Sequence, residues 1–327
     1  MNVYLDNAAT TKTYSAVNEI MKQIIDEDYG NPSSMHIKGY DAEKYLKKTR
    51  EIISKIIKVD AKEIYFTSGG TESNNTALIG AALANNRQGK HIISTRFEHP
   101  SVYNPLLFLE EMGYEIEFLD VDNMGHISID DLHDKIRKDT IIVSIMHVNN
   151  EIGAVQNIEE IGKIIKEKNS KTLFHVDAIQ SFGKYKIYPK RWNIDMLSIS
   201  GHKIHGPKGV GLLYIKDKTK IRPIIHGGGQ EKGLRSGTEN VAAIAGLGVA
   251  AKEMYDKLTD NVKKMYELKI RLINKLKELD GITINGVEVD NIEENVYTIG
   301  DGYSDIKEVY GLNYINNALR ITKTINK

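Results

Sequence analysis

Residues 195–215 read DMLSISGHKIHGPKGVGLLYI, and this stretch gives the strongest indication of how the chain folds. Its first six residues form an apolar run that is typical of a strand buried on both faces of a sheet. Gly201, His202 and Lys203 follow, and a turn rich in glycine and proline leads to a second strand at 209–215. Because ligands bind beyond the carboxyl ends of parallel strands, we expect Lys203 in a ligand crevice. Most loop lysines are only solvated, so this interpretation depends on the neighbouring strand ends.

Short β-rich runs alternate with helical patterns before this stretch. Apolar residues recur at helical spacing over 41–59, 71–85 and 158–168. This alternation predicts an α/β fold with a mostly parallel sheet between helices. Besides 195–200 and 209–215, the predicted strands are IYFT (64–67), HIIST (91–95), IEFLD (116–120), TIIVSIMHV (140–148) and TLFHVDA (172–178).

The pattern changes after residue 237. One long helical stretch is predicted over 238–279, and candidate strands follow at 282–285 and 295–299. We therefore expect three parts: an amino-terminal segment that packs with the small domain (1–15), a large domain that contains the ligand crevice (16–250) and a small carboxyl-terminal domain (251–327).

The composition limits the classes of function. The 327 residues include 44 basic and 44 acidic side chains, so no strong global field attracts the chain to nucleic acid or to an anionic membrane. The sequence contains no leader pattern and no apolar run that would span a bilayer, so we expect a soluble, cytoplasmic protein. No cysteine occurs, which excludes disulfides, thiolate nucleophiles and zinc–thiolate sites from these residues.

The segment IYFTSGGTESNN (64–75) predicts an anion site. A strand ends, Gly69 and Gly70 make a turn, and a helix begins at Thr71. Free backbone N–H groups at the start of a helix favour a phosphate, and glycine allows the backbone to approach it closely. The alternative is an ordinary turn with a threonine cap.

Polar residues also follow three other predicted strands. The residues at these strand ends are His99, then Asn149, Asn150 and Glu151, and then Asp177 with Gln180 shortly after it. A solvated histidine and an ordinary asparagine turn explain the first two sets equally well. A carboxylate at the position of Asp177 is costly to bury unless it is paired, and a ligand cation would pair it.

Taken together, these strand ends meet the requirements of pyridoxal 5'-phosphate (PLP). The lysine would form an imine with the cofactor, and the carboxylate would keep the pyridine nitrogen protonated. A nucleotide-binding domain is disfavoured because neither G-x-G-x-x-G nor G-x-x-x-x-G-K-[ST] occurs. No metal site is expected, because the lysine turn accounts for His202 and His205.

The chain resembles the cysteine desulfurases, in the class V aminotransferase group of fold-type-I PLP enzymes. This resemblance implies a large domain with a mostly parallel mixed sheet between helices, and a shortened small α+β domain. The matching segments follow the family order from residue 4 to about residue 240: YLDNAATT, GNPSSMH, TSGGTESNN, EHPSV, MHVNNEIGAVQ, FHVDAIQS, SISGHKIHGPKGVG and HGGGQEKGLRSGTEN.

The resemblance implies a role for each matching residue. Lys203 would hold the cofactor as a Schiff base, and Asp177 would pair with its pyridinium nitrogen. His99 would stack on the ring and move a proton, and Gln180 would bond the phenolate oxygen. The phosphate ligands would be Thr71, Ser200, His202, the backbone of Gly70 and, in the site of the partner subunit, Thr238.

The resemblance also implies a homodimer with shared sites, because Thr238 would reach the other subunit. Asn7 would line the substrate entrance, Asn150 would help to hold the substrate carboxylate, and Arg320 would grip that carboxylate with its guanidinium group.

The missing cysteine separates this chain from the family. In a desulfurase an enzyme thiolate attacks the substrate sulfur, and both the loop that carries it and part of the family's tail are absent here. We expect a PLP-dependent enzyme that forms a Schiff base with cysteine or a similar small L-amino acid, without a persulfide-forming cysteine of its own. The open alternatives are a β-elimination lyase, an aminotransferase or racemase, a desulfurase whose partner protein lends the thiol, and a catalytically silent scaffold or regulatory subunit of a sulfur-transfer assembly.

Overall fold

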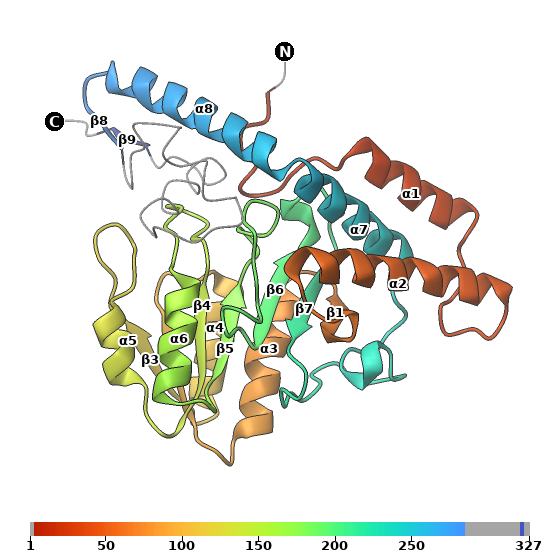
Figure 1. Cartoon of the computed structure of the whole chain (residues 1–327), viewed down its shortest axis with the longest axis horizontal. Coiled ribbons are helices and arrows are strands. Elements are labelled where there is room, and N and C mark those ends of the chain that lie inside the picture. The colour runs from red at the N-terminus through yellow and green to blue at the C-terminus, as the bar shows by residue number, and fades with distance from the viewer. Residues whose placement is uncertain (1–2, 285–320, 324–327) are drawn as a thin grey trace.

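Seven strands form the central sheet of the protein, whose computed structural model describes residues 3–284 and 321–323 (Figure 1). The strand order is β1-β7-β6-β5-β4-β2-β3, and β7 is antiparallel to both of its neighbours while the other neighbouring pairs are parallel. Strands β1 to β6 therefore run in one direction and end at the same edge. The strands are β1 (Ile64–Thr67), β2 (His91–Thr95), β3 (Glu115–Leu119), β4 (Thr140–Met146), β5 (Leu173–Asp177), β6 (Met196–Ser200) and β7 (Gly211–Ile215).

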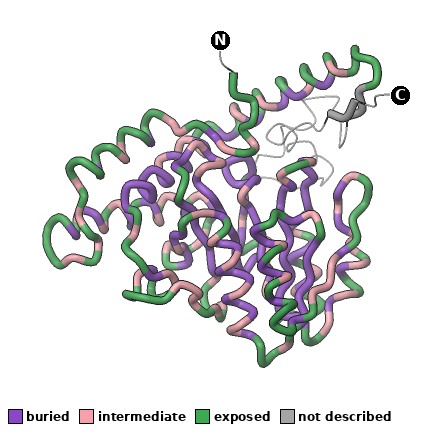
Figure 2. Tube along the Cα trace, turned by 180° about the vertical axis from the view of Figure 1, so that it is seen from behind, coloured by how far each residue is buried: buried purple, intermediate pink, exposed green. Residues whose placement is uncertain are grey.

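Helices cover both faces of the sheet. Successive strand residues point to opposite faces, so the apolar strands pack against helices on both sides. Ile92 packs in a core with α3 and α4, whereas Ile93 packs in the core on the other face, which includes α2, α5, α6 and α7. Figure 2 shows the strands as a buried interior beneath more exposed helices. The helices of this layer structure are α1 (Ser15–Asp26), α2 (Ile37–Ile57), α3 (Gly70–Asn85), α4 (Pro100–Glu111), α5 (Ile129–Lys135), α6 (Ile158–Lys168), α7 (Val241–Asp256) and α8 (Leu258–Lys277), with short 3-10 turns η1 (Ala61–Glu63), η2 (Gly201–Lys203) and η3 (Glu231–Gly233).

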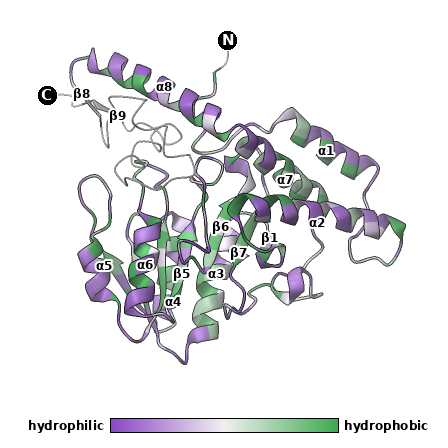
Figure 3. Cartoon of the chain, viewed as in Figure 1, coloured by the Kyte–Doolittle hydropathy of each residue, from purple (hydrophilic) through white to green (hydrophobic). Residues whose placement is uncertain are grey.

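Helices α7 and α8 differ in how they are buried, and along α8 hydrophilic and hydrophobic residues alternate (Figure 3). Most residues of α7 are small, apolar and buried. A Cβ added at Gly248 would lie 2.6 Å from Thr49 Oγ1, so glycine lets α7 approach α2 closely. Within the described residues, no helix combines the length and apolar composition needed to cross a membrane.

After α8, strands β8 (Ile282–Ile284) and β9 (Ile321–Lys323) pair antiparallel. One face of α8 is buried through residues three or four apart: Leu258, Val262, Tyr266, Lys269 and Ile273.

The sequence predicted the sheet more accurately than the helices. The strands at 64–67 and 91–95 agree to the residue, and the other predicted strands that the structure describes agree within two residues at each end. The single helix predicted over 238–279 is wrong, because the backbone of Lys257 (φ −115°, ψ 18°) leaves the helical region and separates α7 from α8.

Four elements were not predicted: α1, α4, α5 and β9. Helix α4 contains Pro105, which disguises its helical pattern, and α5 has only seven residues. Helix α1 was recognisable, because its two buried residues, Val17 and Ile24, lie two turns apart. The candidate strand at 295–299 lies outside the described residues, and the division into three domains stays a prediction.

Candidate active site

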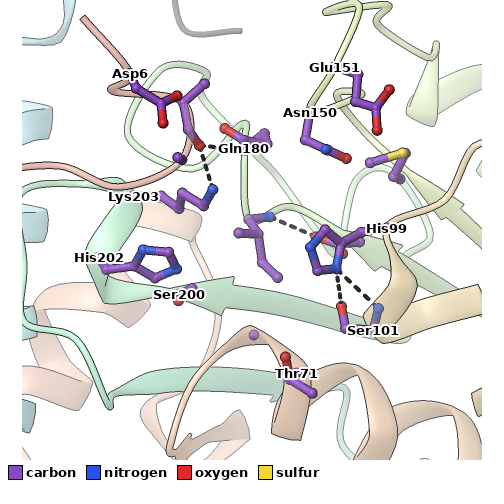
Figure 4. Close-up of a pocket in the computed structure, with 16 residues that line it drawn as sticks. Asp6, Thr71, His99, Ser101, Asn150, Glu151, Gln180, Ser200, His202 and Lys203 are labelled. Carbon is purple, nitrogen blue, oxygen red and sulfur yellow. Dashed lines mark hydrogen bonds between the residues drawn. The ribbon is translucent and has the colours of Figure 1, made fainter. Parts of the chain in front are cut away.

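A cavity of about 590 Å³ opens at the edge of the sheet where β2, β4, β5 and β6 end (Figure 4). Its volume lies in the range of small-molecule sites, roughly 300–1,000 Å³. It brings together most of the residues that the sequence selected, although they come from five separate segments. The predicted residues that line it are Gly70, Thr71, His99, Asn150, Asp177, Gln180, Ser200, His202 and Lys203.

Lys203 lies in η2, the turn that directly follows β6, so its position is set by the end of that strand. Its Nζ donates a hydrogen bond to the carbonyl of Ala8. The amino-terminal segment is attached to the same turn, because the backbone N–H of Thr11 donates to the carbonyl of His202 at 2.9 Å. Burial lowers the pKa of Lys203, although the carboxylates of Asp177 and Asp6 oppose the shift. A lowered pKa makes the neutral, nucleophilic amine more available at neutral pH.

Asp177 is the last residue of β5 and is only 4% exposed. Its Oδ1 accepts the backbone N–H of Ile179 at 2.9 Å, and its Oδ2 accepts an amide N–H of Asn74 at 2.8 Å. Burial raises the pKa of Asp177 above its ordinary value despite these hydrogen bonds and the nearby charges of His99 and Lys203. A cation placed in the cavity would favour the ionised form, as a protonated pyridine nitrogen does.

His99 and Gln180 lie on the wall of the cavity. His99 precedes α4, and its Nδ1 accepts the backbone N–H of Ser101 at 3.1 Å, which caps the helix. Gln180 Nε2 donates to the carbonyl of Ala8 at 3.1 Å, while its buried Oε1 has no hydrogen-bond partner among the residues that the structure describes. A buried acceptor without a partner is costly, and a ligand hydroxyl would satisfy it.

The amino terminus of α3 forms an anion cradle. Gly69 adopts a φ of 153°, which side-chain-bearing residues rarely adopt, and the first helical residue, Gly70, lies so close to Ile179 that an added Cβ would be 2.1 Å from its Cδ1. Thr71 presents an exposed hydroxyl beside the free N–H groups of the first turn. These features suit a phosphate.

Two further groups adjust the charge around this cradle. Burial, followed by the charge of Lys203, lowers the pKa of His202 to about 4, so its ring is neutral at neutral pH. Burial alone would raise the pKa of Glu72, but hydrogen bonds from Arg235 and Ser68 outweigh it and leave that pKa below its ordinary value. The ion pair from Arg235 Nε to Glu72, at 2.8 Å, offsets a carboxylate that would otherwise repel a phosphate.

Two predicted residues, Asn7 and Thr238, do not line the cavity, and the structure does not describe a third. Asn7 is exposed and donates to the carbonyl of Tyr4 at 3.4 Å, and Thr238 is exposed outside the cavity of the single chain. Arg320 lies outside the described residues. Their predicted roles, like those of the residues that do line the cavity, stay predictions.

Sequence reasoning missed several residues of the wall. The resemblance had selected Asn150 and not Asn149, and in the structure Asn149 Oδ1 caps its own turn by accepting the N–H groups of Glu151 and Ile152, whereas Asn150 lines the cavity. Turn chemistry at the first asparagine was the only available signal. The lining residues that were not predicted are Asp6, Ala8, Ala9, Ser101, Met146 and Ile179, while Glu151, noted at its strand end but given no role, also lines the cavity.

The residues present therefore fit PLP. A half-buried amine, a buried carboxylate at a neighbouring strand end, an unsatisfied Gln180 acceptor and a phosphate cradle surround one cavity. This donor and acceptor set matches the amine-reactive aldehyde, pyridine nitrogen, hydroxyl and phosphate of that cofactor.

Comparisons with known proteins agree with this geometry. The protein-family model described as "Aminotransferase class-V" matches residues 3–310 of this chain. Cysteine desulfurase IscS of Dictyoglomus turgidum is 45% identical over 295 residues, which cover 90% of this chain and 74% of that protein. Cysteine desulfurase IscS of Methanosarcina thermophila is 43% identical over 294 residues, which cover 90% of this chain and 72% of that protein.

Solved structures show the same similarity. One described as "NIFS-LIKE PROTEIN" superposes with a TM-score of 0.86 at 41% identity, covering 88% of this chain and 78% of its own. Another, described as "SspA in complex with cysteine", superposes with a TM-score of 0.80 at 40% identity, covering 87% of this chain and 80% of its own.

Proposed function

Because the chain belongs to the cysteine desulfurase group of the class-V aminotransferase family, and is thus a PLP-dependent enzyme of that type, we propose that it acts on cysteine or a similar small L-amino acid. We further propose that it transfers sulfur only to a thiol from outside these 327 residues. The observation that carries the proposal is the placement of Lys203 and Asp177 on adjacent strand ends around one cavity.

Each group of the chain has a definite task in this proposal. When bound, PLP supplies an aldehyde that reacts with amines and a ring that accepts electrons from the substrate's Cα. Lys203 would hold the cofactor covalently, and its Nζ is placed to take and return the Cα proton of the substrate. Asp177 keeps a proton on the pyridine nitrogen, and the α3 cradle with Ser200 and His202 binds the phosphate. His99 covers the ring.

Cysteine is the favoured substrate on two grounds. A structural relative at 40% identity is described in complex with cysteine. In this chain the thioether side chain of Met146, against which a substrate sulfur can pack, lines the cavity. We propose that Asn150 and Arg320 bind the substrate carboxylate and that Asn7 lines the substrate entrance. Thr238 is proposed to reach the phosphate site of a partner subunit in a homodimer, which its exposure in the single chain allows.

The absence of cysteine from these residues supports a second candidate, β-elimination. Removal of the Cα proton and loss of sulfide from Cβ need no enzyme thiol, and hydrolysis of the product gives pyruvate and ammonia. Sulfur transfer to an added thiol would instead leave alanine. The two reactions are therefore separated by the carbon product.

Covalent labelling tests the cofactor site directly. Protein incubated with PLP and reduced with borohydride should carry a pyridoxyl group on Lys203, located by peptide mass. Lys203→Met should lose the label, whereas Lys208→Met, which changes an exposed lysine five positions later, should retain it. A wild-type protein that stays colourless and unlabelled would overturn the proposal.

The products formed from L-cysteine then distinguish the two reactions. Sulfide, pyruvate and alanine are measured separately, with and without an added dithiol. Alanine that appears only with the thiol supports transfer to an external acceptor. Pyruvate that matches sulfide one to one supports β-elimination. A protein that carries PLP on Lys203 but turns over no amino acid contradicts both.

A further inference from the structure

One buried side chain, that of Asn74, connects two parts of the site and has no part in the function proposed above. Asn74, on the second turn of α3, is 0% exposed. Its amide nitrogen donates to Asp177 Oδ2 at 2.8 Å and to Ser101 Oγ at 2.9 Å. A side-chain amide nitrogen carries two hydrogens, so both are used. An ionised carboxylate only accepts, and this fixes which end of the amide faces Asp177.

The second of these hydrogen bonds sets the direction of the next one. Since Asn74 donates to Ser101 Oγ, the Ser101 hydroxyl hydrogen is free to point to its other close neighbour, His99 Nδ1, at 2.7 Å. The backbone N–H of Ser101 donates to the same nitrogen at 3.1 Å. His99 Nδ1 thus accepts twice, so the hydrogen of the neutral ring lies on Nε2.

We propose that Asn74 is a positioning residue that acts through Asp177 and Ser101 at once. Through Asp177 it holds the second carboxylate oxygen, the first being held by Ile179 N–H, so that the carboxylate meets the pyridine nitrogen in one fixed orientation. Through Ser101 it directs the hydroxyl hydrogen to His99 Nδ1, which adds to the backbone N–H of Ser101 in favouring the Nε2–H tautomer and gives the cavity a hydrogen-bond donor instead of a lone pair. The inference rests on the proposed function, because the groups that it orients are those proposed to hold the cofactor.

Packing alone does not account for this residue. Asn74 Oδ1 is buried and finds no hydrogen-bond partner within the described part of the chain, so an apolar side chain of similar size would avoid that cost. The polar side chain is favourable at this buried position only through its two donor contacts. Both of them lead to groups at the cavity, Asp177 directly and His99 through one hydroxyl.

The first test reads the His99 tautomer by long-range ¹H–¹⁵N NMR of the full chain without cofactor, using histidine-selective labelling. Wild type should show a bare Nδ1 and a protonated Nε2. Asn74→Leu and Ser101→Ala should each lower the share of the Nε2–H tautomer, although the backbone N–H of residue 101 still favours it, and Ser101→Thr, which restores the hydroxyl, should restore the wild-type signal. Asn75→Ala is the matched control, because Asn75 donates only to the Thr71 carbonyl of its own helix, at 2.9 Å.

The second test measures the dissociation constant of PLP. Asn74→Leu should raise it about tenfold, Ser101→Ala should raise it less because Asp177 keeps its partner, and Asn75→Ala should leave it unchanged. If Asn74→Leu does not fold, the Ser101 pair still decides the His99 part of the inference. Wild type that binds PLP while Asn74→Leu matches it in affinity and tautomer overturns the inference alone. Wild type that does not bind PLP overturns the proposed function instead, and the NMR result then stands by itself.

Discussion

Replacing Lys184 with methionine should stabilise the cofactor-free protein, and by more at low pH than at high pH. Lys184 is 7% exposed, and its Nζ donates to the carbonyl of Gln180 at 2.8 Å. Burial, together with the nearby charge of Lys203, lowers the pKa of Lys184 to about 7. Methionine keeps a similar unbranched shape but carries no charge.

The size of the effect follows from this shift. The change from an ordinary pKa of 10.5 to about 7 corresponds to roughly 5 kcal/mol, at about 1.4 kcal/mol for each tenfold change in proton affinity. Because the folded pKa lies below the unfolded one, the unfolded chain binds more protons between these values, and stability falls as the pH drops from about 10.5 to about 7. The loss is complete near pH 6 and only about 2 kcal/mol at pH 9.

Urea unfolding of wild type and Lys184→Met near pH 6 and pH 9 measures this difference. The lost hydrogen bond to Gln180 should cost about 1 kcal/mol at both pH values. The net gain should therefore be about 4 kcal/mol near pH 6 and about 1 kcal/mol at pH 9. Lys186→Met, at an exposed position two residues later, should show no such dependence. An equal gain at both pH values would refute the assignment of a buried, titrating amine.

Two other outcomes are expected. Gly211→Ala should destabilise the fold by about 1–3 kcal/mol and weaken PLP binding, because an added Cβ would lie 2.6 Å from the Ile199 carbonyl and 2.7 Å from Gly69 Cα; unchanged urea unfolding would contradict this. Burial lowers the pKa of His147 and of His175 to about 3, so their contribution to stability is present above about pH 6.5 and is lost as the pH falls toward 3. His147→Leu should flatten the acid decline in unfolding free energy by up to about 1.4 kcal/mol per pH unit, and a decline as steep as in wild type would count against it.

The sequence predicted that Lys203 and Asp177 lie at one edge of the sheet because strand ends are local features. Lys203 and Asp177 each follow an apolar run, and the edge at which parallel strands end is shared. The antiparallel strand β7 was also within reach of prediction, because a turn too short for a crossover helix connects it to β6.

The supporting residues could not be predicted, because their contacts are distant in sequence. Asn74 lies 103 residues from Asp177 and 27 from Ser101, and nothing in TESNN distinguishes it from Asn75. Ala8 contributes only its carbonyl oxygen, which every residue possesses. Such roles depend on three-dimensional packing and leave no pattern in the residue types.

The carbonyl of Ala8, which accepts from both Gln180 and Lys203, has a consequence for how the protein folds. The partners of these two contacts are separated by 172 and 195 positions along the chain. Closing such long loops is slow and entropically unfavourable until most of the intervening sheet exists. During synthesis the amino-terminal segment emerges first but cannot reach its place until the lysine turn has been made. The wall beside Lys203 is therefore completed late in folding, and capacity to hold the cofactor should appear only after the sheet has formed.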